Sequence, residues 1–242
     1  MVPVLQFQRR LEKALSRTEP SIEPLACSIL KSNMGPSSTD NIKRLLRESG
    51  LGHHWNTVLD AGRSTYLAEK IMSYLPESNS TILDVLSGTG TLANELRMRG
   101  CTVVETERFS DYGRSSASHA TVDFSRRAIL RNRPFDVVMV VTSIHHEPRV
   151  DPLIGWLSTL HTKQYLIIEN LRTEDTDLAL HERMDWFFNR CLNDFGAECP
   201  GWYWDKSQWE MIAQSLGNAH WQETLDNVPG IPFSYDLFLV NT

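Results

Sequence analysis

The sequence predicts an α/β domain whose sheet is mostly parallel and carries helices on both faces. After residue 81, short segments that are apolar along their whole length alternate with segments of helical periodicity. Such strands are buried on both faces, and parallel neighbours need a crossover that is usually a helix. A turn with two glycines follows the first strand, in TILDVLSGTGTLA at residues 81–93, and a helical pattern begins directly after it.

The preceding residues, 1–56, are predicted to form a helical N-terminal extension. Apolar side chains recur in it at spacings near three and four, as expected for helices that bury one face. Pro20, Pro24 and the sequence GPSS at residues 35–38 are expected to divide it into short helices. Residues 57–242 then form the main domain, which opens with an amphipathic helix at residues 57–75.

Seven strands are expected in the main domain. Their predicted ranges are 82–86, 102–106, 121–124, 135–142, 165–169, 221–225 and 235–240. Helices are predicted at residues 92–100, 153–160, 178–193 and 207–216. The last two strands follow the last helix, so we expect them to pair as a hairpin at the edge of the sheet.

Composition limits the classes of partner. The chain has 242 residues and a formal net charge of -6, which argues against a large nucleic-acid surface. No apolar run approaches the roughly 20 residues of a membrane span, and the N-terminus lacks the apolar core of a signal peptide. The four cysteines have no metal-type spacing and fit reduced thiols. We therefore expect a cytoplasmic protein, monomeric or homodimeric, without a membrane or nucleic-acid partner.

The glycine turn marks the candidate ligand site. In an open parallel sheet, ligands bind beyond the carboxyl ends of the strands, where the strand order reverses. Gly88 and Gly90 let the backbone approach a ligand closely, and the helix start that follows offers free N–H groups. The turn alone fits a dinucleotide, a mononucleotide phosphate or S-adenosylmethionine (SAM). It fits a tight strand-to-helix connection equally well.

Polar residues at the ends of the next strands narrow this choice. Glu107 ends the second strand, where one carboxylate can accept hydrogen bonds from both hydroxyls of a ribose. Asp123 and Phe124 follow the third strand, where the carboxylate can accept an adenine amino proton and the ring can flank the base. Thr142 and Ser143 end the fourth strand over the same edge of the sheet.

Together these motifs resemble the class I SAM-dependent methyltransferases. In that family the first strand carries a turn like Asp-x-Gly-x-Gly-x-Gly, and the fourth strand often reads Phe-Asp-x-Val with a Leu-His-His ending. The matching residues here are Asp84, Gly88, Gly90, Glu107, Asp123, Phe135, Asp136, Val138, His145 and His146. Leu86 stands where the first glycine is usual. The resemblance covers roughly residues 60–242.

The resemblance implies a Rossmann-like fold with a seven-stranded sheet, an antiparallel last strand and SAM as cofactor. It also implies that the helix before the first strand closes over the cofactor, with Arg63 on the methionine carboxylate; the alternative is an ordinary surface arginine. The residues predicted to bind SAM are Arg63, Tyr66, Asp84, Ser87, Gly88, Gly90, Glu107, Asp123, Phe124, Thr142 and Ser143. A Rossmann dehydrogenase accounts less well for the whole set of motifs, and no Walker A loop follows the turn.

Methyl transfer from a sulfonium needs alignment of the acceptor and in some cases a base. His145 and His146 are the candidate catalytic residues, because histidine titrates near neutral pH. The alternative, which we favour, is that these histidines only shape the SAM pocket. One of the two adjacent side chains is expected to face it.

The residues expected to contact the acceptor follow the fifth strand. Asn170 ends that strand, while Asp185 and Asn189 share one face of the next helix. His181 lies on the same face, and for it we favour a solvated position without a role. The aromatic segment around residues 202–204 forms either a lid over the pocket or a packing surface for the last helix. From this segment, Trp202 and Tyr203 are the predicted substrate contacts.

The sequence therefore predicts a SAM-dependent methyltransferase for a small-molecule acceptor, methylated on oxygen or nitrogen, as in natural-product biosynthesis. One alternative is transfer or cyclisation of the aminocarboxypropyl arm of SAM, which releases methylthioadenosine. The other is a non-catalytic SAM-binding or partner-binding protein. No metal site is predicted: His53 and His54 are adjacent on a helical pattern, and no third ligand lies near them in the sequence.

Overall fold

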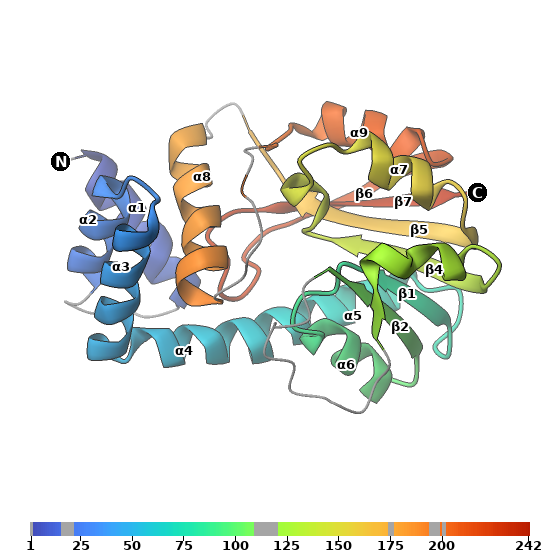
Figure 1. Cartoon of the computed structure of the whole chain (residues 1–242), viewed down its shortest axis with the longest axis horizontal. Coiled ribbons are helices and arrows are strands. Elements are labelled where there is room, and N and C mark those ends of the chain that lie inside the picture. Colours follow the sequence, from blue (N-terminus) through green and yellow to red (C-terminus); the bar gives the residue numbers. More distant parts are fainter. Residues whose placement is uncertain (1, 16–21, 109–120, 174–176, 194–198, 200–201) are drawn as a thin grey trace.

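The computed structural model describes residues 2–15, 22–108, 121–173, 177–193, 199 and 202–242. Within this part of the chain, one twisted sheet carries helices on both faces, and a group of helices stands at one end of it (Figure 1). The N-terminus lies in that group of helices, whereas the C-terminus lies on the far side of the sheet (Figure 1).

The sheet has seven strands in the order β3-β2-β1-β4-β5-β7-β6. Their bounds are β1 (Thr81–Val85), β2 (Thr102–Glu107), β3 (Thr121–Asp123), β4 (Pro134–Val141), β5 (His161–Asn170), β6 (Asn218–Leu225) and β7 (Tyr235–Asn241). The first five strands pair in parallel, and β7 is antiparallel to both of its neighbours. The predicted sheet and its edge hairpin are confirmed. The strand order reverses between β1 and β4, which is where a ligand site is expected.

Two apolar cores, one on each face, explain why the central strands are apolar along their whole length. The covering helices are α5 (Ser64–Tyr74) and α6 (Thr91–Met98) on one face, and α7 (Asp151–Leu157) and α9 (Lys206–Gln214) on the other. In β4, Val137 and Met139 face the first core, whereas Val138 and Val140 face the second. The period of two in a strand places alternate side chains on opposite faces.

The N-terminal extension consists of four helices: α1 (Val2–Leu15), α2 (Ile22–Lys31), α3 (Pro36–Ser49) and α4 (Leu51–Thr57). Pro24 and Pro36 lie in the first turns of α2 and α3, where a backbone N–H has no partner within the helix. The predicted division of the extension into short helices is confirmed: α2 ends at Lys31 and α3 begins at Pro36. Each of these prolines stands where a helix starts, and Pro20 lies outside the described residues.

The helix α4 continues through a π-helical turn, η1 (Val58–Arg63), directly into α5. The predicted boundary between residues 56 and 57 therefore falls inside one continuous helical segment (Figure 1). That segment connects the group of N-terminal helices to the sheet.

The predicted helix at residues 178–193 is observed as α8 (Leu178–Trp186) followed by the π-helical turn η4 (Phe187–Leu192). It packs on the N-terminal helices: the ring centre of Trp55 in α4 lies 5.1 Å from that of Phe187 and 5.2 Å from that of Phe188. Arg183 donates hydrogen bonds to the backbone carbonyls of Ile29 and Ser32. We call α1 to α4 together with α8 and η4 the helical cap (Figure 1). Among the described helices, none has the length and apolar character to cross a bilayer.

Candidate active site

A cavity of about 450 Å³ opens at the carboxyl ends of the central strands, at the reversal of strand order. It is lined by the turn after β1, the end of β2, the loop after β4, the end of β5, the helical cap and residues 231–235. Its volume lies within the range of small-molecule sites. The helical cap and the edge of the sheet thus enclose one site.

The turn after β1 lines this cavity. Leu86, Gly88 and Gly90 have φ values of 58°, 58° and 76°. A Cβ atom on Gly90 would lie 2.6 Å from Oε1 of Glu105, a buried carboxylate that pairs with Arg97 at 2.6 Å. Leu86 occupies the left-handed region that glycine adopts without strain, at a cost of about 1–3 kcal/mol. That conformation explains why glycine is usual at this position.

Glu107 is fixed at the cavity by the backbone on both sides of it. Its Oε2 accepts a hydrogen bond from the backbone N–H of Gly88 at 2.7 Å, and its Oε1 accepts one from the backbone N–H of Arg108 at 2.6 Å. The residue is 7% exposed and lines the cavity. Each carboxylate oxygen has two lone pairs and can accept more than one hydrogen bond.

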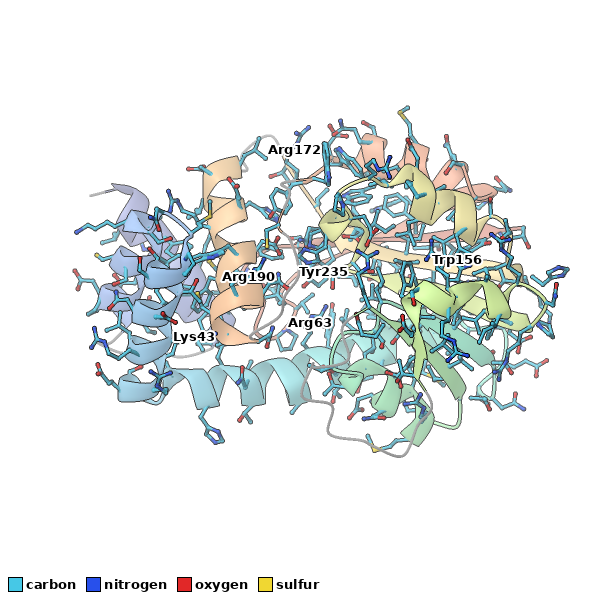
Figure 2. All side chains as sticks on the ribbon, viewed as in Figure 1. Lys43, Arg63, Trp156, Arg172, Arg190 and Tyr235 are labelled. Atoms are coloured by element: carbon cyan, nitrogen blue, oxygen red, sulfur yellow. The ribbon has the colours of Figure 1, made fainter. Side chains whose placement is uncertain are left out.

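On the opposite wall, Arg63 lies at the end of η1 and donates from Nη2 to Oγ1 of Thr142 at 2.8 Å. Its guanidinium carbon lies 5.9 Å from the ring centre of Tyr235, and Figure 2 shows the two residues together at the centre of the molecule. Thr142 has a φ of 49°, a strained value for a β-branched residue. Strained backbone and π-helical turns both concentrate at functional sites.

An ion pair between Arg108 and Glu147, at 2.8 Å, separates this cavity from a second depression. Asp123 and Phe124 line the second depression and not the main cavity. Arg108 also stacks over the ring of Phe124 at 5.0 Å, and Asp123 accepts a hydrogen bond from the backbone N–H of Ser125. The predicted adenine contacts therefore lie beyond the Arg108–Glu147 pair, at the edge of the site.

Beside the ends of β4 and β5 lies a buried charged group centred on His145. Its Nδ1 is 2.6 Å from Oε2 of Glu169, and its Nε2 is 3.5 Å from Oδ1 of Asp185. Burial lowers the pKa of His145, but the charges of Glu169 and Asp185 outweigh it and raise that pKa to about 10. Glu169 also accepts hydrogen bonds from the backbone N–H groups of Ser143 and Ile144, which fixes the loop after β4.

Asp185 is the second buried carboxylate of this group. Its Oδ2 accepts a hydrogen bond from the hydroxyl of Tyr203 at 2.8 Å, and its Oδ1 accepts one from the amide of Asn189 at 3.0 Å. Nε2 of His146 lies 3.8 Å from the same Oδ1. Burial raises the pKa of Asp185, but the neighbouring His146 and His145 hold it well below the usual range. The ionised carboxylate is therefore the stable form.

His181 shares the helix face with Asp185 but is only 1% exposed, so the predicted solvated position is wrong. Its ring stacks on Phe233 at 4.5 Å and lies 4.3 Å from Tyr203. Burial lowers the pKa of His181 to about 4, which keeps the ring neutral at pH 7. Phe233 and Tyr203 cover this face of α8, and the ring of His181 is therefore buried instead of solvated.

Most of the predicted site residues line the cavity: Arg63, Asp84, Ser87, Gly88, Glu107, Thr142, Ser143, His145, His146, Asn170, Asp185 and Asn189. Both histidines do so, contrary to the expectation that only one would. Gly90 does not line the cavity and lies against the side chain of Glu105. The other predicted contacts that do not line the cavity are Tyr66, Asp123, Phe124, Trp202 and Tyr203.

The aromatic segment packs mainly on the last helix. Trp204 contacts Trp209 of α9 at 4.8 Å, and Trp202 is 40% exposed outside the cavity. Tyr203 is buried and reaches the site through its hydrogen bond to Asp185.

Sequence reasoning missed the apolar wall of the cavity, which consists of Phe188, Ile231, Phe233 and Tyr235. One signal was available for Tyr235: the first residue of an antiparallel last strand lies at the same edge of the sheet as the last residues of the parallel strands. No comparable periodic signal marks the loop before β7. Arg108 and Glu147 were also missed, since their pairing depends on the approach of two loops.

No protein-family model matches the chain, and no curated protein matches it in sequence. Solved structures do. A candidate O-methyltransferase from Nostoc punctiforme has a TM-score of 0.54 at 11% identity, over 99% of this chain and 72% of that one. A mitomycin 7-O-methyltransferase has a TM-score of 0.50 at 16% identity, over 89% of this chain and 75% of that one. The protein has the class I SAM-dependent methyltransferase fold.

The same fold also matches a protein described by another reaction. A cyclopropane-fatty-acyl-phospholipid synthase-like protein from Lactobacillus casei has a TM-score of 0.53 at 10% identity, over 74% of this chain and 91% of that one. The fold therefore indicates where the site lies, whereas the reaction has to be inferred from the residues in the site.

Proposed function

We propose that the protein is a SAM-dependent methyltransferase that acts on a small-molecule acceptor. The observation that carries this proposal is Glu107, a carboxylate fixed at the end of β2, facing the cavity beside the strained turn after β1. A ribose presents two neighbouring hydroxyls, and the two oxygens of Glu107 can accept one hydrogen bond from each. The fold and the matching structures support the same cofactor.

In this proposal SAM spans the carboxyl ends of β2, β1 and β4. The ribose binds Glu107, and the backbone of residues 86–88 follows the cofactor closely. Arg63 holds the methionine carboxylate, because its guanidinium is already oriented by Thr142 and Tyr235. The loop after β4 would then lie beside the site of methyl transfer.

The remaining part of the cavity has an apolar wall and a polar end. Phe188, Phe233 and Tyr235 give flat apolar contact, whereas His146 and Asp185 form the polar end. This combination fits a flat acceptor that carries a hydroxyl or an amine. A lone pair of that group attacks the methyl carbon while the carbon–sulfur bond breaks toward sulfur, which gives S-adenosylhomocysteine. The acceptor's proton is released to solvent at the polar end of the cavity.

The test is turnover against a panel of small phenols, aromatic amines and aliphatic alcohols, with S-adenosylhomocysteine and methylated product measured by mass spectrometry. We expect equimolar formation of both with at least one aromatic acceptor and none with Glu107→Ala. Methylthioadenosine in place of S-adenosylhomocysteine would show that the aminocarboxypropyl arm reacts. Tight SAM binding without turnover on any acceptor would favour a non-catalytic SAM-binding protein.

A further inference from the structure

Three side chains at the polar end of the cavity bring potential metal-ligand atoms close together. Nε2 of His145 and Nε2 of His146 lie 3.5 Å and 3.8 Å from the same oxygen, Oδ1 of Asp185. All three potential ligand atoms lie within 4.8 Å of one another. Ligand atoms about 2.0–2.2 Å from a common metal ion lie roughly 3–3.6 Å apart, so small shifts would close this set around one ion.

Two buried carboxylates make this point favourable for a cation. Glu169 is fully buried and the side chain of Asp185 is 5% exposed, so two carboxylates face the His145 ring from either side. Nδ1 of His145 is occupied by Glu169. A lone pair on Nε2 would face the negative oxygen of Asp185 at 3.5 Å, with the amide nitrogen of Asn170 beside it at 3.3 Å. A proton or a metal ion between Nε2 and that oxygen would remove the repulsion.

Two observations favour a metal ion over a proton alone. The first is the outer contact of each ligand: His145 is oriented by Glu169, and Asp185 by Tyr203 and Asn189. Such a carboxylate on the far nitrogen of a histidine is the usual support of a metal ligand, because it fixes the ring and raises its basicity. His145 has that support from Glu169, and Asp185 accepts hydrogen bonds as a ligating carboxylate usually does.

The second observation is Asn170. Its Oδ1 is buried and has no hydrogen-bond partner in the part of the chain that the structure describes. Its amide nitrogen lies 3.3 Å from Nε2 of His145. The oxygen and nitrogen of an amide exchange places on rotation of the group, and rotation would bring this oxygen to the same point as the other ligand atoms. An ion there would satisfy a buried oxygen that otherwise costs free energy.

We propose that His145, His146 and Asp185 bind a divalent transition-metal ion of the zinc type, with Asn170 as a further oxygen ligand. Two imidazoles and a carboxylate are the ligands of zinc and neighbouring metals, whereas magnesium and calcium prefer oxygen alone. The two histidines can reach one ion because they lie in a short 3₁₀ turn, η3 (Ile144–His146), with ring centres 4.0 Å apart. All four of these side chains line the cavity. A coordination position of the ion would therefore face the space in which a small molecule binds.

The site itself does not depend on methyl transfer, but its role does rest on the proposed function. An acceptor hydroxyl bound at the open position would lose its proton more readily, as metal-bound water does. The metal would also fix the oxygen in front of the sulfonium methyl group. This role narrows the acceptor class to hydroxyl compounds, since a neutral alcohol or phenol gains most from the metal.

The test uses the tag-free full chain after treatment with a chelator, titrated with Co²⁺ alone. Cobalt in a site of nitrogen and oxygen ligands with low coordination number gives strong visible absorption, which requires no enzyme activity. We expect one equivalent of Co²⁺ per chain, displaced by one equivalent of Zn²⁺. His146→Ala and Asp185→Asn should weaken this binding by roughly 100-fold or more, since loss of an outer contact alone costs 10–100-fold.

The matched control is His161→Ala. His161 is an exposed histidine at the first residue of β5, at the opposite edge of the sheet from the cavity. It should bind Co²⁺ like the natural chain, and circular dichroism should show that all variants are folded. No stoichiometric visible band, or equal binding by all variants, overturns the proposal and leaves a proton as the cation. SAM binding to the metal-free chain, measured in parallel, tests the proposed function separately.

Discussion

Oε2 of Glu107 lies 2.7 Å from the backbone nitrogen of Gly88, so a charged hydrogen bond joins the end of β2 to the turn after β1. One side chain thus shapes the turn and offers acceptor oxygens to the cavity. The two strands are neighbours in the sheet, with Asp84 of β1 paired with Glu105 of β2. Their register is what sets the carboxylate opposite the turn.

The first prediction concerns this carboxylate. Glu107→Ala should weaken SAM binding by at least about tenfold, because hydrogen bonds to a charged acceptor are worth about 1.5–3 kcal/mol. Isothermal titration calorimetry measures the effect. Glu223→Ala is the control, because Glu223 pairs with Lys70 and does not line the cavity. Unchanged affinity in a folded Glu107→Ala protein would remove the ribose assignment.

Gly90 lies in the turn after β1, against the side chain of Glu105. Its substitution tests the stability of the fold and not the binding of a ligand. Gly90→Ala should lower the free energy of unfolding by at least about 2 kcal/mol, since the new Cβ meets Glu105 at 2.6 Å and φ is +76°. Gly155→Ala is the control: its Cβ would meet nothing within 4 Å, and alanine in helix α7 should stabilise by about 0.5–1 kcal/mol. Urea unfolding compares the two; equal effects would contradict the account of the turn.

Arg63 is assigned to the methionine carboxylate, and ligands that lack this group provide the test. Arg63→Ala should weaken binding of S-adenosylhomocysteine by roughly 10–100-fold, the value of a charged hydrogen-bonded pair. Methylthioadenosine lacks the aminocarboxypropyl arm, so its affinity should stay the same. If the substitution weakens both ligands equally, Arg63 supports the cavity wall and does not hold the carboxylate.

Substitution of two buried tyrosines tests whether the buried carboxyl group of Asp185 is ionised. The hydroxyl of Tyr203 donates to Asp185 at 2.8 Å, and that of Tyr165 donates to the carbonyl of Leu157 at 2.6 Å. Burial raises the pKa of Tyr165 to about 12 and raises that of Tyr203 as well, so both are protonated donors at pH 7. Tyr165→Phe should cost about 1 kcal/mol and Tyr203→Phe about 2–3 kcal/mol, because a charged acceptor loses more. Thermal and urea unfolding measure both; a smaller loss for Tyr203→Phe would argue against an ionised Asp185.

The sequence predicted the sheet well because its strands are marked by continuous apolar runs, and burial on both faces is what such runs require. It predicted Glu107 for a related reason: a carboxylate directly after a buried strand must lie at the ligand edge. The prolines at residues 24 and 36 correctly indicated a division into short helices, and the structure shows that each of them lies in the first turn of a helix.

The remainder of the site depends on contacts between distant segments. The burial of His181 depends on Phe233 and Tyr203, which lie 52 and 22 residues away along the chain. The convergence of His145, His146 and Asp185 depends on the packing of α8 over the loop after β4. Neither a periodic pattern nor a local spacing records such contacts.

The most direct test of the central claim is calorimetric titration of the purified full chain with SAM, followed by mass spectrometry of the ligand. The account predicts that one SAM binds per chain and is recovered intact when no acceptor is present. Absence of binding to the folded protein would contradict the assignment of the cavity and of Glu107.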